Sequence, residues 1–207
     1  MGAVTFSGAS KGVGGLNNYA DVVPTAYEEV YDVTDGRDHG VVGNISSTNA
    51  FNYNGTFGSL TVSAMYSPAS TSSSSFVLEY ADLMDGLTIG AGTGEVGTTQ
   101  DEETMYVKYV MGGLTVGAQS SEVDFDAATS TDEEALVLAA TFAVNENLTV
   151  GYAQMDVEFD SSTLVDQEDS GFGVSYTMGS ITIGGDVKQR DNVSGSSGKN
   201  NENTELN

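Results

Sequence analysis

Hydrophobic and polar residues alternate along most of this chain with a period of two. From Phe76 to Tyr80, large apolar side chains occupy every second position, and the same pattern returns from Phe172 to Tyr176. Because successive side chains of a β-strand point to opposite faces, the pattern predicts strands with one apolar face and one polar or small face. About eleven strands are expected, near residues 2–7, 50–55, 59–66, 75–82, 87–92, 104–110, 114–123, 133–143, 148–158, 170–177 and 181–189.

Turn signals join these strands into hairpins. An aromatic residue, a tight turn and the phrase Leu/Ile-Thr-Val/Ile-Gly/Ser recur five times, with the threonine at 61, 88, 115, 149 and 182. Short turns are expected at Asn54-Gly55, Asp85-Gly86, Gly112-Gly113, Asn145–Asn147 and Gly179-Ser180, and long polar connections at 67–75, 93–103, 124–132, 160–169 and 190–203. Short turns on one side and long loops on the other are typical of an outer-membrane β-barrel. The predicted fold class is all-β, an antiparallel meander that is part of a transmembrane barrel.

Residues 9–47 interrupt the pattern, because they contain no obvious strand pair. A connection of this length inside a compact domain is usually functional or a sign that elements within it have been missed. Glycines lie within several predicted strands, for example Gly171 and Gly173. Glycine weakens an ordinary strand but suits a wall that a second element approaches closely.

Composition removes several classes of function. The chain has 207 residues with no cysteine, and its formal charge is −24 with a pI near 4.1. The lack of cysteine excludes disulfides, thiolate metal sites and cysteine nucleophiles. The strong negative charge argues against nucleic acid as a partner. No run approaches the roughly 18 apolar residues of a transmembrane helix. Met1 leads directly into the first strand without a signal peptide, so either the protein is cytosolic or its front end is missing.

No motif supports catalysis. The sequence Gly92–Gly97 matches GxGxxG, but a further strand follows it instead of the helix that would bind a pyrophosphate. His39 has no second histidine and no serine at motif spacing. The chain is therefore not expected to be an enzyme.

Residues 49–66 carry a family resemblance. Their sequence, Asn-Ala-Phe-Asn-Tyr-Asn-Gly-Thr-Phe-Gly-Ser-Leu-Thr-Val-Ser-Ala-Met-Tyr, resembles the stretch that follows the long third loop in Gram-negative general porins. The positions that match the family pattern are Asn49, Phe51, Tyr53 and Gly58. The overall sequence is most similar to that of the α-proteobacterial porins of the Rhodobacter type. Ser46 stands where the family often has an arginine of the pore constriction.

The resemblance implies a place for this chain in a sixteen-stranded barrel. If 9–47 is the third loop, the first strand here is the family's fifth and the last is its fifteenth. Residues 203–207 would then open the missing last strand. The expected domain is a single incomplete β-barrel domain over 1–207, with 9–47 as an inward-folding constriction loop.

The resemblance also implies a function and a site. The chain would form a water-filled channel in the outer membrane of a Gram-negative bacterium, in contact with outer-membrane lipid. Small hydrophilic solutes would diffuse through it, and the full-length protein would be a homotrimer. The constriction would come from the loop, with Tyr27 and Arg37 beside the acidic residues that form its negative side. The lumen wall would carry Glu79, Lys108 and Lys188. The acidic residues concerned are Glu28, Glu29, Asp32, Asp35 and Asp38, and their excess predicts a modest cation preference.

Three alternatives remain open at this point. The acidic residues also fit a solvated loop, and Glu28, Asp32 and Asp35 are candidate ligands for Ca²⁺, although no EF-hand spacing is present. The whole chain also fits a secreted acidic β-sandwich that acts as an adhesin or carbohydrate-binding module. In a sandwich, the polar strand faces would form the outside and the aromatic residues the core or sugar-binding platforms.

Overall fold

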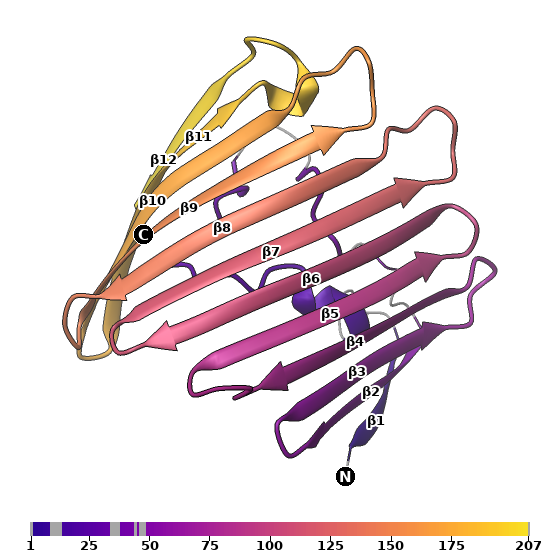
Figure 1. The fold of residues 1–207 in the computed structure, drawn as a ribbon, viewed down its shortest axis with the longest axis horizontal. Helices are drawn as coiled ribbons and strands as arrows, with labels where there is room; N and C mark the ends of the chain where they lie inside the picture. The colour runs from indigo at the N-terminus through magenta and orange to yellow at the C-terminus, as the bar shows by residue number, and fades with distance from the viewer. Residues whose placement is uncertain (1, 9–13, 34–37, 44, 46–48, 207) are drawn as a thin grey trace.

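The computed structural model describes residues 2–8, 14–33, 38–43, 45 and 49–206. Among these residues, twelve strands form one curved antiparallel sheet in which each strand pairs with the next along the chain (Figure 1). The strands are β1 (Ala3–Ser7), β2 (Ala50–Phe57), β3 (Leu60–Ser67), β4 (Ser73–Ala81), β5 (Leu87–Val96), β6 (Gln100–Met111), β7 (Leu114–Phe125), β8 (Glu133–Ala143), β9 (Leu148–Phe159), β10 (Gln167–Met178), β11 (Ile181–Asp191) and β12 (Asn201–Leu206). The sheet is open, with β1 and β12 as its edges.

The predicted all-β meander is confirmed, and the structure adds a twelfth strand. β12 pairs with β11 from Gly185 opposite Leu206 to Arg190 opposite Asn201. Two short 3-10 helices, η1 (Gly15–Tyr19) and η2 (Val193–Gly195), are the helical elements of the described residues. Neither is long and apolar enough to cross a membrane.

The first predicted turn is wrong. Asn54 and Gly55 lie inside β2, and the chain reverses at Gly58 and Ser59, where Gly58 has a φ of 65°. That left-handed conformation suits glycine. Gly55 serves a different purpose, because the hydroxyl of Tyr53 lies 2.5 Å from the position of a Cβ there. Asn-Gly is thus a site of close packing in this chain and not a hairpin turn.

The long connection predicted at 93–103 is also wrong. β5 continues to Val96 and β6 begins at Gln100, so only Gly97–Thr99 join them. The period of two persists here, with Glu102 and Thr104 buried and Glu103 exposed. On the exposed face, carboxylates take the place of apolar residues. The alternation of hydrophobic and polar residues, by which strands are predicted, is therefore not visible here. The other long connections are Pro68–Ser72, Asp126–Asp132, Asp160–Asp166 and Asn192–Asn200.

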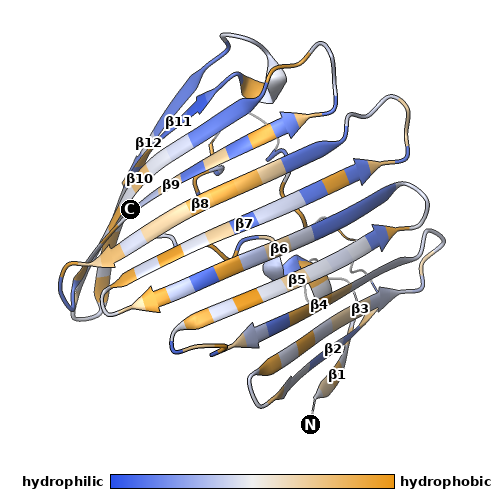
Figure 2. Ribbon diagram, in the orientation of Figure 1, coloured by the Kyte–Doolittle hydropathy of each residue, from blue (hydrophilic) through white to orange (hydrophobic). Residues whose placement is uncertain are grey.

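The two faces of the sheet differ in chemistry. Residues 14–33, 38–43 and 45, which we call the segment 14–45, cover one face of the sheet. We call that face the inner face and the opposite one the outer face. The outer face exposes a series of large apolar side chains: Phe51, Tyr66, Phe76, Leu78, Tyr80, Met105, Leu136, Leu138, Phe142, Tyr152, Phe172, Tyr176, Ile183 and Val187. Hydrophobic residues gather toward the end with the short turns, and hydrophilic residues toward the end with the β5–β6 and β7–β8 connections (Figure 2).

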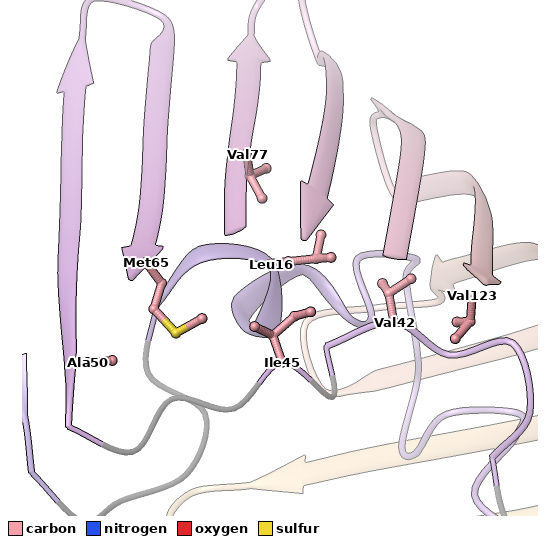
Figure 3. Close-up of a cluster of buried hydrophobic side chains, with 7 residues drawn as sticks. All are labelled: Leu16, Val42, Ile45, Ala50, Met65, Val77 and Val123. Carbon is pink, nitrogen blue, oxygen red and sulfur yellow. The ribbon is translucent and has the colours of Figure 1, made fainter. Parts of the chain in front are cut away.

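The apolar core of the described residues lies between the inner face and the segment 14–45. One cluster contains Leu16, Val42, Ile45, Ala50, Met65, Val77 and Val123 (Figure 3). A second cluster contains Val30, Ala135, Val137, Ala139, Ala153, Met155 and Val157. Both clusters join residues of the segment to residues of the sheet. Packing against the wall, and not against a second sheet, therefore holds the segment in place.

Candidate functional site

The segment 14–45 enters the inner face through η1. The backbone N–H of Gly15 donates to Ser63 Oγ, and that of Leu16 donates to Ser75 Oγ, both at 3.1 Å. Leu16 is fully buried among residues of β3, β4 and β7 (Figure 3). Small hydroxyl residues on the wall thus provide acceptors for N–H groups that the first turn of a helix leaves without partners.

Glycines on the wall allow the middle of the segment to approach the sheet. A Cβ on Gly117 would lie 2.6 Å from Pro24 Cδ, and a Cβ on Gly184 would overlap the ring of Tyr27. A Cβ on Gly151 would lie 3.0 Å from the Cβ of Ala26. The expectation that strand glycines accommodate a second element is therefore confirmed at β7, β9 and β11.

Polar side chains of the wall bind the backbone of the segment. Gln119 Nε2 donates to the carbonyl of Tyr19 at 2.9 Å, and Gln119 Oε1 accepts from the N–H of Val22 at 3.1 Å. Two buried carboxylates act in the same way, because Glu102 accepts from the N–H of Gly43 and Glu133 from that of Gly40. Each of these contacts satisfies a backbone group that the segment would otherwise bury unpaired.

Two buried cations of β11 lie beneath the segment. Arg190 is fully buried and donates from Nε and Nη2 to both oxygens of Asp169 at 2.8 Å, while Nη2 also donates to the carbonyl of Tyr31 at 2.7 Å. Lys188 is 1% exposed, with Nζ 3.1 Å from Asp186 Oδ2.

The Lys188 ammonium also binds the segment itself. Nζ lies 3.4 Å from Glu28 Oε2 and donates to the carbonyl of Asp32 at 2.9 Å. Both cations of β11 therefore hold the segment to the wall, and each has a carboxylate of the wall as a partner.

The acidic side chains of the segment are only partly buried. Asp32 and Asp38 are exposed, and Glu28 and Glu29 are half-buried. Burial, together with a hydrogen bond shared with Glu29, raises the pKa of Asp21 from 3.8 to about 7. Burial and a hydrogen bond with Asp32 also raise the pKa of Glu28. The segment thus carries interacting carboxyl groups, some of which hold protons more tightly than usual.

The remaining residues predicted for the site have distinct places. Glu79 Oε2 accepts from the hydroxyl of Tyr106 at 2.7 Å on the inner face, and Lys108 is half-buried on the same face. Asp35 and Arg37 lie outside the described residues. Within the described ranges, no three His, Cys, Asp or Glu side chains converge closely enough to hold a metal ion. The calcium hypothesis, which includes Asp35, stays a prediction.

His39 joins three elements. Its Nδ1 lies 2.8 Å from Glu133 Oε1 on β8, and its Nε2 lies 3.1 Å from Ser194 Oγ in η2. The ring also packs edge-on against Phe159, with 5.1 Å between ring centroids. The order serine, histidine, carboxylate matches a nucleophilic triad, but the backbone N–H groups of Ser194 and the two residues after it already donate within the fold. Because no donors for an oxyanion are left there, these contacts of Ser194, His39 and Glu133 are structural and not catalytic.

Sequence patterns do not single out several of these wall residues. Arg190 and Glu102 lie in the predicted connections 190–203 and 93–103, and Glu133 is the first residue of the predicted strand 133–143. The signal that identifies Arg190 is its position two residues after Lys188 and four after Asp186, on the same face of an extended strand.

Comparisons with known proteins agree with this geometry. The family model described as Gram-negative porin matches residues 2–207. The fold is similar to that of the outer-membrane protein OmpT of Vibrio cholerae, with 17% sequence identity and a TM-score of 0.68 over 99% of this chain and 74% of that chain. It is also similar to the anion-selective porin from Comamonas acidovorans, with 12% identity and a TM-score of 0.67 over 77% of this chain and 58% of that chain. A mutant porin of Rh. blastica matches with 13% identity and a TM-score of 0.60 over 99% of this chain and 71% of that chain.

No curated protein sequence matches the chain. The chain spans 58% of the length of the Comamonas porin, and at these identities the solved structures show the fold alone. The family model, in contrast, covers nearly all of the sequence. The chain therefore belongs to the Gram-negative porins, the outer-membrane β-barrel family of channel proteins, and is not an enzyme.

Proposed function

We propose that this chain forms the wall and the constriction of a water-filled channel through which small hydrophilic solutes diffuse across the outer membrane. The apolar outer face suits contact with lipid, and the polar inner face suits a lumen. The segment 14–45 would be the constriction, because it lies on the inner face and carries charged side chains that would be costly against lipid.

The observation that carries the proposal is the unequal exposure of the two signs of charge. Lys188 and Arg190 are buried beneath the segment and paired with Asp186 and Asp169, whereas Asp32 and Asp38 are exposed. Among the described residues, the segment therefore presents more acidic than basic charge. A ring of carboxylates in a narrow pore favours cations over anions, so we propose a modest cation preference.

The oligomeric state and the porin subfamily are proposed from the family resemblance alone. The full-length protein would be a homotrimer of the α-proteobacterial, Rhodobacter-type porins. The alternative, a secreted acidic β-sandwich, requires two sheets packed face to face, whereas the described strands form a single sheet. Extraction separates the two, because a barrel protein needs detergent and a sandwich stays in buffer.

The reversal potential in planar bilayers tests the proposed selectivity. The complete protein in a salt gradient at neutral pH should give a steady conductance with a reversal potential on the cation-selective side. Anion selectivity would refute the proposed constriction charge, and a protein that inserts without conductance would refute the channel itself.

A further inference from the structure

Ser194, in the connection between β11 and β12 (residues Asn192–Asn200), contacts His39 of the segment 14–45. Ser194 Oγ lies 3.1 Å from Nε2 of His39. On its other side, His39 is bound to Glu133 of β8, whose second oxygen accepts from the N–H of Gly40 at 2.7 Å. A side chain of the β11–β12 connection thus touches the ring that fixes the second half of the segment to the wall.

A second path leads from Ser194 to the middle of the segment. The N–H of Ser194 donates to Gln167 Oε1 at 2.9 Å, and Gln167 Nε2 lies 3.3 Å from Asp169 Oδ2. Asp169 binds Arg190, and Arg190 donates to the carbonyl of Tyr31. The side chains of Gln167, Asp169 and Arg190, which connect the two ends of this path, are buried. Rigid, buried hydrogen-bond chains are the kind of network that transmits a displacement between two sites.

The backbone of Ser194 supports a specific role for this residue. Its φ of 53° and ψ of 38° lie in the left-handed region, which serine adopts rarely. Such a conformation persists only where surrounding contacts enforce it. Here Ser194 makes the N–H bond to Gln167 and the hydroxyl contact with His39 in this conformation.

We propose that Ser194 and His39 are positioning residues that couple the β11–β12 connection to the constriction segment, so that the width of the channel depends on the position of that connection. The inference rests on the proposed channel function. A protein or polymer that binds Asn192–Asn200 would then change the channel current without entering the lumen. A direct obstruction of the lumen would not need Ser194, which separates the two mechanisms.

A labelling experiment tests this coupling, because the chain has no cysteine of its own. Ser196→Cys places one thiol on the exposed part of the connection, and a bulky maleimide attached there perturbs the connection. Ser130→Cys, in the exposed β7–β8 connection, is the matched control. Each variant of the complete protein is prepared with and without Ser194→Ala, which removes the hydroxyl and keeps the backbone N–H.

Two readouts are measured on each sample. One is the rate of transitions between conductance levels in planar bilayers, and the other is amide hydrogen exchange at Gly40, whose N–H is bound to Glu133. The label on Ser196→Cys should raise both rates about two- to tenfold, the effect of losing roughly one hydrogen bond. Ser194→Ala should reduce the effect of the label to less than twofold, and the label on Ser130→Cys should change neither rate.

The outcomes separate the coupling from the channel function. An equal effect of the label with and without Ser194→Ala, or no effect in either, would overturn the coupling. If the protein shows no conductance at all, the proposed function fails, and the exchange of Gly40 alone decides whether the connection is tied to the segment. A conductance effect that requires Ser194, together with the exchange effect, supports the whole inference.

Discussion

Replacing Arg190 with methionine should destabilise the protein more than any other single loss of charge on β11. Arg190 is fully buried and forms a two-bond pair with Asp169, which is also fully buried, at 2.8 Å for each bond. Methionine has a similar length and no charge, so the variant would leave the Asp169 carboxylate buried without its cation. It would also remove the bond to the carbonyl of Tyr31.

The expected cost follows from this geometry. Breaking a buried ion pair by removing one partner costs about 3–5 kcal/mol of unfolding free energy. Replacing both partners with apolar residues of similar size is often nearly neutral, so Asp169→Leu combined with Arg190→Met should recover most of the loss. Lys199→Met is the control, because Lys199 is exposed and a surface change of this kind alters stability by no more than about 0.5 kcal/mol.

Denaturant unfolding in detergent micelles, followed by far-UV circular dichroism, measures these differences. If the Arg190→Met variant unfolds at the same denaturant concentration as the wild type, the pair does not hold the wall as described. If the double variant is no more stable than the single one, the cost has a source other than an unpaired buried carboxylate.

Three further outcomes are expected for the constriction. Neutralising the acidic residues of the segment, by Glu28→Gln, Glu29→Gln and Asp32→Asn together, should lower the cation preference about two- to threefold, because carboxylates that line a narrow pore favour cations. The far-UV spectrum should stay unchanged. An unaltered reversal potential would contradict a role of these carboxylates in selectivity. The raised pKa of Asp21, about 7 against 3.8, means that the folded protein binds more protons than the unfolded chain between these values. The free energy of unfolding should therefore fall as the pH rises from about 4 to about 7. The cation preference of the channel should rise as the pH passes through 7. The Asp21→Asn variant should show neither of these two changes. Gly117→Val should push the segment off the wall, because even a Cβ there would lie 2.6 Å from a ring carbon of the segment; single-channel conductance should change, and an identical conductance would contradict the packing.

The strands were predictable because their signal is local. Alternation from Phe76 to Tyr80 requires no knowledge of the rest of the fold, and β4 lies where the pattern places it. The failures occurred where local signals have two meanings. Asn54-Gly55 is the commonest hairpin signal, yet here the glycine accommodates Tyr53.

The site was less predictable, because its contacts join residues far apart in the sequence. The acidic composition of 9–47 indicates a charged segment, and Lys188 can be assigned to the polar face of its strand. Arg190 lies directly opposite Asp169 in the β10–β11 hairpin, but the predicted strands 170–177 and 181–189 stop one residue short of both. No periodicity pairs His39 with Ser194, since that contact depends on the path of the segment across the inner face. The strand glycines are the best sequence indication of that path, because each marks a place where a side chain would obstruct it.

The most direct test of the account is the ion selectivity of the complete protein. We expect purified protein in planar bilayers, under a salt gradient at neutral pH, to conduct steadily with a reversal potential that favours cations. We expect neutralisation of Glu28, Glu29 and Asp32 to move that potential toward zero. Absence of conductance, or a reversal potential that favours anions, would contradict the account.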